Sequence, residues 1–195
     1  MNGSATVVRS GCMAKDADMI LSEFILLGIG GKELSEENTA QTAKALNIIQ
    51  PDFIRVHATG IKLESKLGEF VRDGSFTLQS EEEIVIEQKL FLQQLHEMDS
   101  YYVNEHIVNL LLEVRGNLRT EKQEMLSTID RFLTLPPDER LLFTVGRRLN
   151  IFFRLDDLKK PKLHQKAGES LQQILSKNPH VDFAALCNYV RQSQI

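Results

Sequence analysis

The chain has no tryptophan, two cysteines and five prolines among its 195 residues. Cys12 and Cys187 lie far apart and form no Cys-x-x-Cys pair, which excludes a disulfide framework and the common zinc motifs. No apolar run approaches the roughly 18 residues of a membrane span, and no basic segment followed by an apolar one marks an export signal. The net charge of −4 gives no reason to expect nucleic acid or an anionic membrane as a partner. We therefore expect a cytoplasmic protein without a metal site of its own.

Residues 1–79 alternate between helix and strand patterns, beginning with a helix over residues 7–17. The apolar segment SEFILLG at residues 22–28 is typical of a strand buried in a parallel sheet. A glycine-rich turn follows it, and then a helix that we expect to begin with Ser35 as its N-cap and to end before Pro51. The alternation in DFIRVHAT at residues 52–59 predicts a second strand. Together these elements predict a right-handed parallel βαβ unit.

Residues 80–195 have the spacing of helices alone. Ser80 and Glu83 form the sequence signature of a capping box at the start of the first one. The expected helices cover residues 80–98, 104–114, 120–135, 137–149, 162–176 and 182–192. Two strands do not make a stable sheet by themselves. We therefore expect additional strands upstream of Met1.

Two stretches of this pattern resemble a known family. LSEFILLGIGGKELS at residues 21–35 and PDFIRVHATGIKLESKLGEFVRDGSFTLQSEEE at residues 51–83 resemble the later strands of radical S-adenosylmethionine (SAM) enzymes. The similarity is to the branch related to coproporphyrinogen dehydrogenase and to the catalytic subunit of elongator. The segments DSYYVNEHIVNLL and LLFTVGRRLNIFFRLDDL resemble the C-terminal extension of that branch. The residues that match its P-D-x-I-x-V and G-x-F motifs are Pro51, Asp52, Ile54, Val56, Gly74 and Phe76.

The resemblance implies an α/β fold. It places the last two strands and helices of a partial (β/α) TIM-type barrel in residues 1–79, followed by an all-helical C-terminal extension in residues 80–195. The family holds a 4Fe–4S cluster on a C-x3-C-x2-C motif, which this sequence does not contain. The resemblance therefore implies a C-terminal fragment that is not catalytically competent alone. Its partner would be an N-terminal radical SAM half or a second copy of itself.

The resemblance also implies which residues lie at the cofactor. In the family, the glycine turn passes along the adenine of SAM, because glycine permits close approach of the backbone. Alternation along the second strand puts Arg55 and His57 on one face, where they would border the ribose and the substrate. The implied cofactor-binding residues are Leu26, Gly28, Ile29, Gly30, Arg55 and His57. The resemblance implies no catalytic residue, and no metal ligand, on this chain.

The same residues also have simpler interpretations. Glu33 occupies the position of the last glycine in G-x-G-x-x-G, so the motif alone favours a structural turn over a nucleotide contact. Arg147 and Arg148 suggest either an anion-binding patch or, as we favour, solvated charges on a helix. A second hypothesis for the whole chain is a non-catalytic helical interaction module that self-associates or binds a partner protein.

Overall fold

The computed structural model describes residues 3–194. Over these residues the chain is a mixed α/β protein with a four-stranded sheet, and none of its helices is long and apolar enough to span a membrane. In chain order the elements are α1 (Gly3–Asp16), β1 (Ser22–Leu27), α2 (Ser35–Ile49), β2 (Phe53–Ala58), α3 (Lys66–Asp73), α4 (Glu81–Gln94), β3 (Tyr101–Val103), β4 (Gly116–Asn117), α5 (Lys122–Leu133), α6 (Pro137–Arg148), the 3-10 helix η1 (Leu155–Lys159), α7 (Pro161–Lys177) and α8 (Phe183–Gln192).

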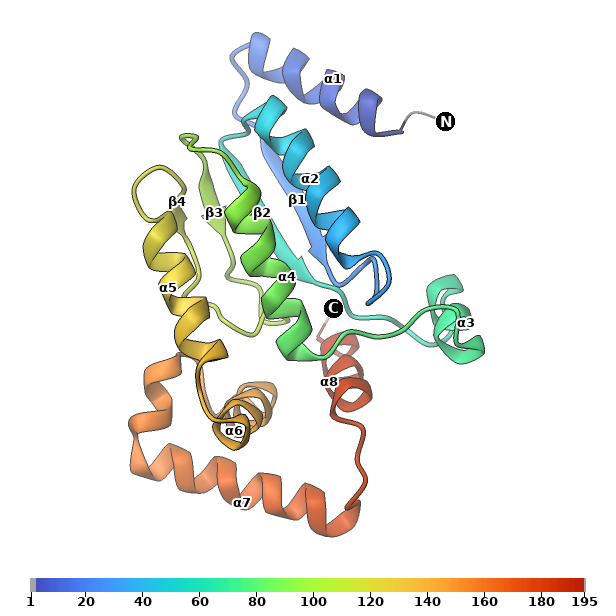
Figure 1. Ribbon diagram of the computed structural model, residues 1–195, viewed down its shortest axis with the longest axis vertical. Coiled ribbons are helices and arrows are strands. Elements are labelled where there is room, and N and C mark those ends of the chain that lie inside the picture. Colours follow the sequence, from blue (N-terminus) through green and yellow to red (C-terminus); the bar gives the residue numbers. More distant parts are fainter. Residues whose placement is uncertain (1–2, 195) are drawn as a thin grey trace.

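The strands lie in the order β1-β2-β3-β4 (Figure 1). The pairs β1–β2 and β2–β3 are parallel, and β4 runs antiparallel to β3. The predicted βαβ unit is confirmed in β1, α2 and β2. The register places Leu26 beside His57 and Arg55 beside Val103, so side chains from three strands share each face of the sheet.

The expectation of helices alone after residue 79 is wrong for residues 101–117, which supply β3 and β4. The helix expected over residues 104–114 does not form either. Asn104 and Asn109 explain this difference, because their buried side-chain amides hydrogen-bond to each other and to backbone groups. Asparagine side chains that bind the backbone in this way compete with helical hydrogen bonding.

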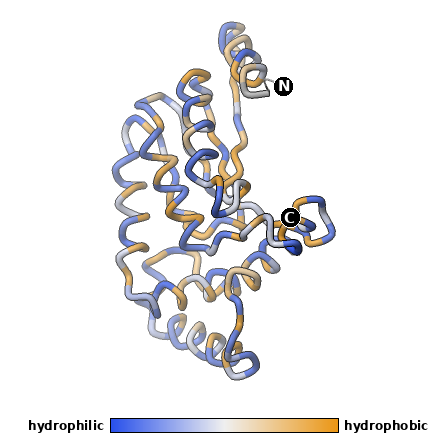
Figure 2. Tube along the Cα trace, turned by 45° about the vertical axis from the view of Figure 1, so that its right-hand side comes forward, coloured by the Kyte–Doolittle hydropathy of each residue, from blue (hydrophilic) through white to orange (hydrophobic). Residues whose placement is uncertain are grey.

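Helices α2 and α4 cover one face of the sheet (Figure 1). Ile25, Leu27, Ile54 and Val56 are buried beneath them. Figure 2 shows hydrophobic and hydrophilic residues alternating along the helices, as expected for helices with one face against a core. Among residues 3–194, no helix covers the opposite face of the sheet in this way, and Phe24 on that face is 63 % exposed.

The last helix returns to the end of β2. The Asn188 side chain accepts a hydrogen bond from the Ile61 amide at 2.8 Å and donates one to the Ile61 carbonyl at 3.0 Å. Arg191 donates to the Thr59 carbonyl at 3.1 Å. These contacts join α8 to a segment almost 130 residues earlier, so the C-terminal helices and the sheet form one packed unit.

Glu81 at the start of α4 lies where α6 and α8 meet. Its carboxylate accepts bidentate hydrogen bonds from Arg148 at 3.0 and 2.6 Å and pairs with Arg191 as well. The interpretation of Arg147 and Arg148 as solvated helix charges is wrong, because both side chains are buried. Their burial follows from α6 packing against α7 and α8 and from the ion pair of Arg148 with Glu81 at the start of α4.

Candidate functional site

The uncovered side of the sheet, which we call the open face, carries the residues expected at a cofactor. Along β2 the side chains alternate as predicted, with Arg55 and His57 half-buried on the open face and Val56 buried on the other. Leu26 lies beside His57 in the register and is exposed. The open face consists of Phe24, Leu26, Phe53, Arg55, His57, Tyr101 and Val103.

The glycine turn follows β1 at the carboxyl end of the sheet. Gly28 has a φ of 82° and Gly31 one of 62°, backbone conformations that L side chains rarely adopt. Gly30, in contrast, has no positive φ and is restricted by the Leu34 carbonyl, which would lie 2.9 Å from an added Cβ. The turn therefore needs glycine for two reasons: Gly28 and Gly31 adopt a positive φ, and Gly30 leaves no room for a side chain.

Glu87 on α4 holds this turn from beneath. Its buried carboxylate accepts hydrogen bonds from the Gly28 amide at 3.2 Å, the Ser35 hydroxyl at 2.8 Å and the Asn38 side chain at 3.2 Å. The prediction that Ser35 is the N-cap of α2 is wrong. Leu34 is the N-cap, and the Ser35 hydroxyl donates a hydrogen bond to Glu87 instead. The turn is thus fixed before any ligand arrives, which favours binding by reducing its entropic cost.

Several polar groups at this end of the sheet have no partner among residues 3–194. They include the backbone amides of Ile29 and Gly30, which no hydrogen bond occupies. They also include two buried side-chain oxygens, Oε1 of Gln79 and Oγ1 of Thr59. A methyl group added to Gly28 would lie 3.3 Å from that Gln79 oxygen. Because buried polar groups are normally paired, the oxygens of Gln79 and Thr59 indicate places for a polar partner. The amides of Ile29 and Gly30 lie in a partly exposed turn, where a ligand can reach them.

Arg55 is held in place on the open face by its neighbours. Its guanidinium carbon lies 6.0 Å from the centre of the Phe24 ring and 5.8 Å from that of Phe53, both within cation–π range. Its Nε donates to the Ser22 hydroxyl at 3.1 Å. The charge is therefore presented between two aromatic side chains on an exposed surface.

His57 forms a second feature of the open face, together with His106 from the segment after β3. Their ring centres are 4.2 Å apart, and Phe24 meets the His57 ring edge-on at 5.5 Å. The pKa of His57 is lowered, first by burial and then by the charges of His106 and Arg55. The imidazole is therefore kept neutral at pH 7, with a nitrogen lone pair available as a base or hydrogen-bond acceptor.

These side chains line a shallow hollow of about 300 Å³ on the open face. Its polar groups come from Arg55, His57, His106 and Glu105, of which Glu105 is paired with Arg115, and its apolar ones come from Phe24, Val56 and Val103. Sequence reasoning missed His106 and Glu87, because each reaches the site only through folding. The strand alternation that identified His57 gives no information about a loop 49 residues later.

Asn109 fixes the segment that carries His106. Its side-chain oxygen accepts from the Ala58 amide at 2.7 Å, and its amide nitrogen donates to the Val56 carbonyl and to Asn104, each at 2.6 Å. The two asparagines attach the segment after β3 to the end of β2. The network of the two asparagines thus positions His106 against His57, with the two ring planes tilted by 31°.

The cysteines do not fit a 4Fe–4S cluster. Cys12 lies on α1 and Cys187 on α8, two helices that lie well apart (Figure 1), and both are free thiols. Such clusters are held by cysteine thiolates grouped around them, usually four and three in the radical SAM motif. Residues 3–194 also contain no group of three or more acidic, histidine or cysteine side chains arranged to hold a metal ion.

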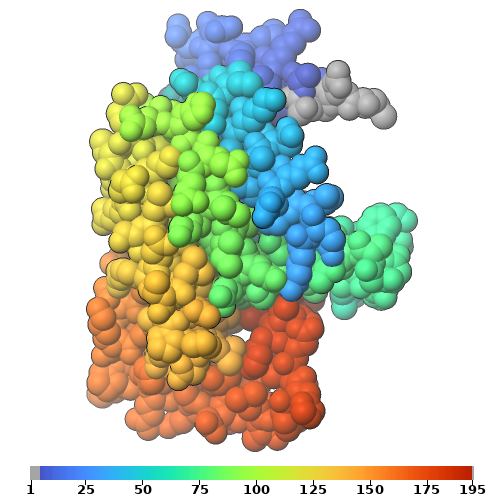
Figure 3. All heavy atoms as spheres, viewed as in Figure 1, coloured from blue at the N-terminus to red at the C-terminus, as the bar shows by residue number. Residues whose placement is uncertain are grey.

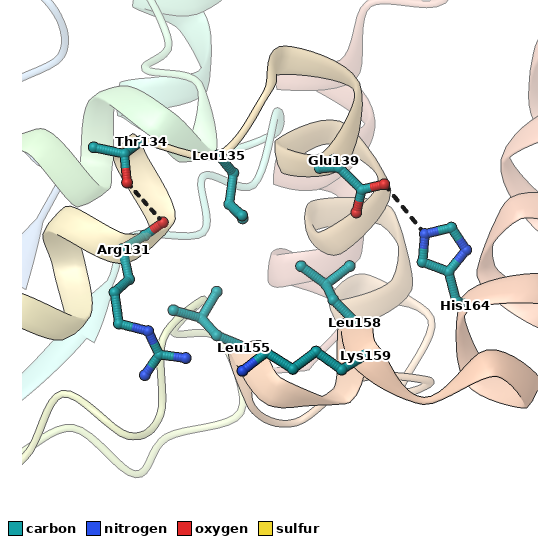
Figure 4. Close-up of a pocket in the computed structure, with 8 residues that line it drawn as sticks. All are labelled: Arg131, Thr134, Leu135, Glu139, Leu155, Leu158, Lys159 and His164. Carbon is teal, nitrogen blue, oxygen red and sulfur yellow. Dashed lines mark hydrogen bonds and ion pairs between the residues drawn. The ribbon is translucent and has the colours of Figure 1, made fainter.

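A larger hollow, of about 480 Å³, lies between α5, α6, η1 and α7, far along the chain from the glycine turn (Figure 4). Its charged groups are already paired. His164 contacts Glu139 at 3.2 Å, and Arg131 and Lys159 both bind Asp156, at 2.9 and 2.7 Å. It therefore offers a ligand less unpaired charge than the open face does.

Comparison of the chain with protein-family models, with curated proteins and with solved structures found no match.

Proposed function

We propose that this chain is the C-terminal part of a radical SAM-type (β/α) barrel and supplies the adenine-side wall of the SAM pocket and part of the substrate pocket. One observation supports this proposal above the others. Strands β1, β2 and β3 are parallel, yet within the described part of the chain helices cover one side of them and leave the other open. Parallel sheets are normally covered on both faces, and in a barrel the inner face closes on other strands.

The unpaired polar groups support a ligand at the carboxyl end of these strands, where barrel enzymes have their sites. The amides of Ile29 and Gly30 are suited to the edge of an adenine ring. Arg55 and His57 lie on the same open face and would border the ribose and substrate. Leu26 would make an apolar contact with the ligand, and Gly28 would allow the backbone turn that approaches it.

The iron–sulfur cluster of that family does not fit this chain, because its cysteines are too few and lie too far apart. A 4Fe–4S cluster would have to come from a separate N-terminal half. We accordingly propose that the chain alone performs no radical chemistry and binds SAM only as part of a two-part assembly.

The test begins with the DNA upstream of the Met1 codon, read in all three frames over about 600 bases, since a complete barrel takes roughly 250 residues. A C-x3-C-x2-C motif encoded there supplies the matching half. The two polypeptides are then mixed and SAM binding is measured by equilibrium dialysis. Saturable binding that needs both halves is the expected result. If the mixture assembles a cluster but this chain adds nothing to SAM affinity, the proposal is wrong.

A matched pair of variants locates the site within the assembly. His57→Gln removes a ring on the open face and should weaken SAM or substrate binding. His180→Gln changes an exposed histidine in the segment between α7 and α8 and should leave binding unchanged. Equal effects of the two substitutions would place the ligand elsewhere.

A second candidate function is a non-catalytic interaction module that self-associates. The observation that favours it is a group of exposed apolar side chains on and just before β1, namely Met19, Ile20, Phe24 and Leu26. Strand β1 is also an edge of the sheet within the described residues. Exposed apolar edges promote pairing with another chain.

Sedimentation velocity distinguishes this candidate. A self-associating module should form dimers or larger species as concentration rises, and Phe24→Lys should return it to monomer. The matched control is Val7→Lys, an exposed apolar residue of α1 away from the sheet. A chain that stays monomeric at all concentrations would rule out self-association.

A further inference from the structure

The open face carries a positive charge that pairs with no carboxylate of the described chain. Among residues 3–194, Arg55 forms no ion pair, and its only hydrogen bond runs from Nε to the Ser22 hydroxyl at 3.1 Å. The hydrogens on both of its Nη atoms therefore remain available to a ligand. The guanidinium is held against the rings of Phe24 and Phe53, so it loses little side-chain entropy when it binds an anion.

The two histidines of the open face can also donate hydrogen bonds. His106 Nδ1 accepts one from the Val108 amide at 3.4 Å, which places the proton of the neutral ring on Nε2. No hydrogen bond within residues 3–194 occupies the ring of His57, whose centre lies 4.2 Å from that of His106. A neutral imidazole keeps one N–H group, so each of the two rings offers a donor.

Arg55, His57 and His106 line the same hollow of about 300 Å³, and all three are half-buried rather than closed off from solvent. Figure 3 shows the opposite side of the sheet, where the side chains of α2, α4 and α5 fill the surface. No helix within residues 3–194 covers the hollow in this way, and Phe24 in its wall is exposed. A ligand can therefore reach the three polar side chains directly from solvent.

The other lining residues determine the charge that a ligand must carry. Glu105 supplies the carboxylate of this lining, and it pairs with Arg115. The remaining lining residues are the apolar Phe24, Val56 and Val103. Even with both imidazoles neutral, Arg55 leaves the hollow with a net positive charge, because Arg115 balances the charge of Glu105. The hollow therefore favours an anion.

The number of donors favours a phosphoryl group over a carboxylate. The planar fork of Arg55 alone satisfies the two oxygens of a carboxylate in one plane. A phosphoryl group carries three acceptor oxygens, so it can take the fork with two of them and accept from His57 or His106 with the third. The apolar part of the lining suits a non-polar group attached to the phosphate.

We propose that the hollow on the open face binds a phosphate monoester with a small apolar substituent. The phosphoryl oxygens accept hydrogen bonds from Arg55, His57 and His106, and the substituent packs against Phe24 and Val103. This inference rests on the proposed function only in assigning the open face to the substrate, and it names the class of that substrate. All of the binding groups belong to this chain, so the site is tested without a second half.

Isothermal titration calorimetry of the full chain compares phenyl phosphate, inorganic phosphate and benzoate. Phenyl phosphate should bind at least about fivefold more tightly than inorganic phosphate, because its ring leaves water. It should also bind at least about fivefold more tightly than benzoate, because the phosphoryl group accepts from more donors. An NMR titration should show that bound phenyl phosphate raises the pKa of His57, because a nearby anion favours the imidazolium form.

A matched pair of arginine variants locates the phosphoryl group. Arg55→Gln should weaken phenyl phosphate binding about tenfold or more, since a charge-assisted pair is lost. Arg9→Gln removes an exposed arginine of α1 and should leave the affinity unchanged. The thermal unfolding midpoint shows whether Arg55→Gln keeps the fold. If it does not, His106→Ala replaces it and should weaken binding about two- to fivefold.

The outcomes that overturn the proposal are specific. No saturable heat with phenyl phosphate would mean that the hollow takes no such anion. Equal affinity for benzoate would mean that the hollow recognises charge and not the phosphoryl group. Equal losses for Arg55→Gln and Arg9→Gln would move the ligand away from the open face.

These results are separate from the test of the SAM pocket. Phenyl phosphate binding by a chain that adds nothing to SAM affinity in the two-part mixture would support this site and contradict the SAM pocket. Saturable SAM binding by the mixture, with no phenyl phosphate binding by the chain, would do the reverse.

Discussion

The buried carboxylate of Glu81 makes a sharp test of what holds the C-terminal helices to the sheet. Glu81→Gln keeps the shape of the side chain but removes the charge that Arg148 and Arg191 share. Removing one partner of a buried ion pair typically costs about 3–5 kcal/mol, because the remaining charge stays buried without compensation. Total stabilities are about 5–15 kcal/mol, so the loss would be a large fraction of the whole.

Urea unfolding followed by circular dichroism measures this loss. With a slope of about 1–3 kcal/mol per molar urea, the midpoint for Glu81→Gln should fall by more than about 1 M. The adjacent Glu82 is the matched control, because it lies in the same turn of α4 and pairs with Arg140 at 3.1 Å in a partly exposed position. Glu82→Gln should cost only about 0.2–1 kcal/mol. Equal midpoints for the two variants would refute the reasoning.

The pH dependence gives an independent check on the same residue. Burial raises the pKa of the Glu81 carboxyl, but the charges of Arg148 and Arg191 outweigh burial and leave this pKa below its ordinary value of 4.5. The unfolded chain therefore takes up this proton first as pH falls. Glu81 stabilises the fold above pH 4.5, and this contribution declines at lower pH. The Glu81→Gln variant should show a flatter acid limb in its stability profile.

Three further predictions concern the sheet and its open face. Asn109→Ala removes three buried hydrogen bonds and should lower the free energy of unfolding by about 2–3 kcal/mol in urea titrations, and a change under about 0.5 kcal/mol would contradict this. His106→Ala should raise the pKa of His57 in an NMR titration, because it reduces both the burial and the repulsion that lower this pKa, whereas a fall would be unexpected. Gly28→Ala should destabilise the fold more than Gly74→Ala, because both positions have φ near 80° but only an added methyl group at Gly28 meets other side chains. Similar thermal shifts would show that backbone strain alone matters.

Local patterns were enough to predict the first half of the sheet. The alternation in β2 shows which face each of its six residues buries. The apolar run of β1 correctly predicted a strand, but the expectation that this strand is buried in the sheet is wrong for Phe24 and Leu26, which are exposed because no helix among residues 3–194 covers their face. The capping box at Ser80 and Glu83 was also predicted and is present, because it involves only neighbouring residues. Sequence patterns therefore predict those helices and strands that are determined by residues close together in the chain.

Strand β3 and the segment after it could not be predicted in this way. Tyr101–Val103 is too short to show a period. The apolar residues after Asn104 have helical spacing, but Asn109 binds a strand more than 50 residues away. The same limit applies to the candidate site, where His57 was found by alternation but His106 was not. The burial of Arg148 could not be predicted for the same reason, because it depends on the ion pair with Glu81, which lies 67 residues earlier in the chain.

The contacts between α8 and the end of β2 have a consequence for the order of events during synthesis. Asn188 and Ile61 are separated by 127 residues, so at about 5–20 residues per second the ribosome needs roughly 6–25 s to add α8 after Ile61. Until α8 has been made, Thr59 and Ile61, just after β2, lack the side chains of Arg191 and Asn188 that bind their backbone groups, and Glu81 lacks Arg191. The contacts that close the carboxyl end of β2 can therefore form only after the last helix has been synthesised.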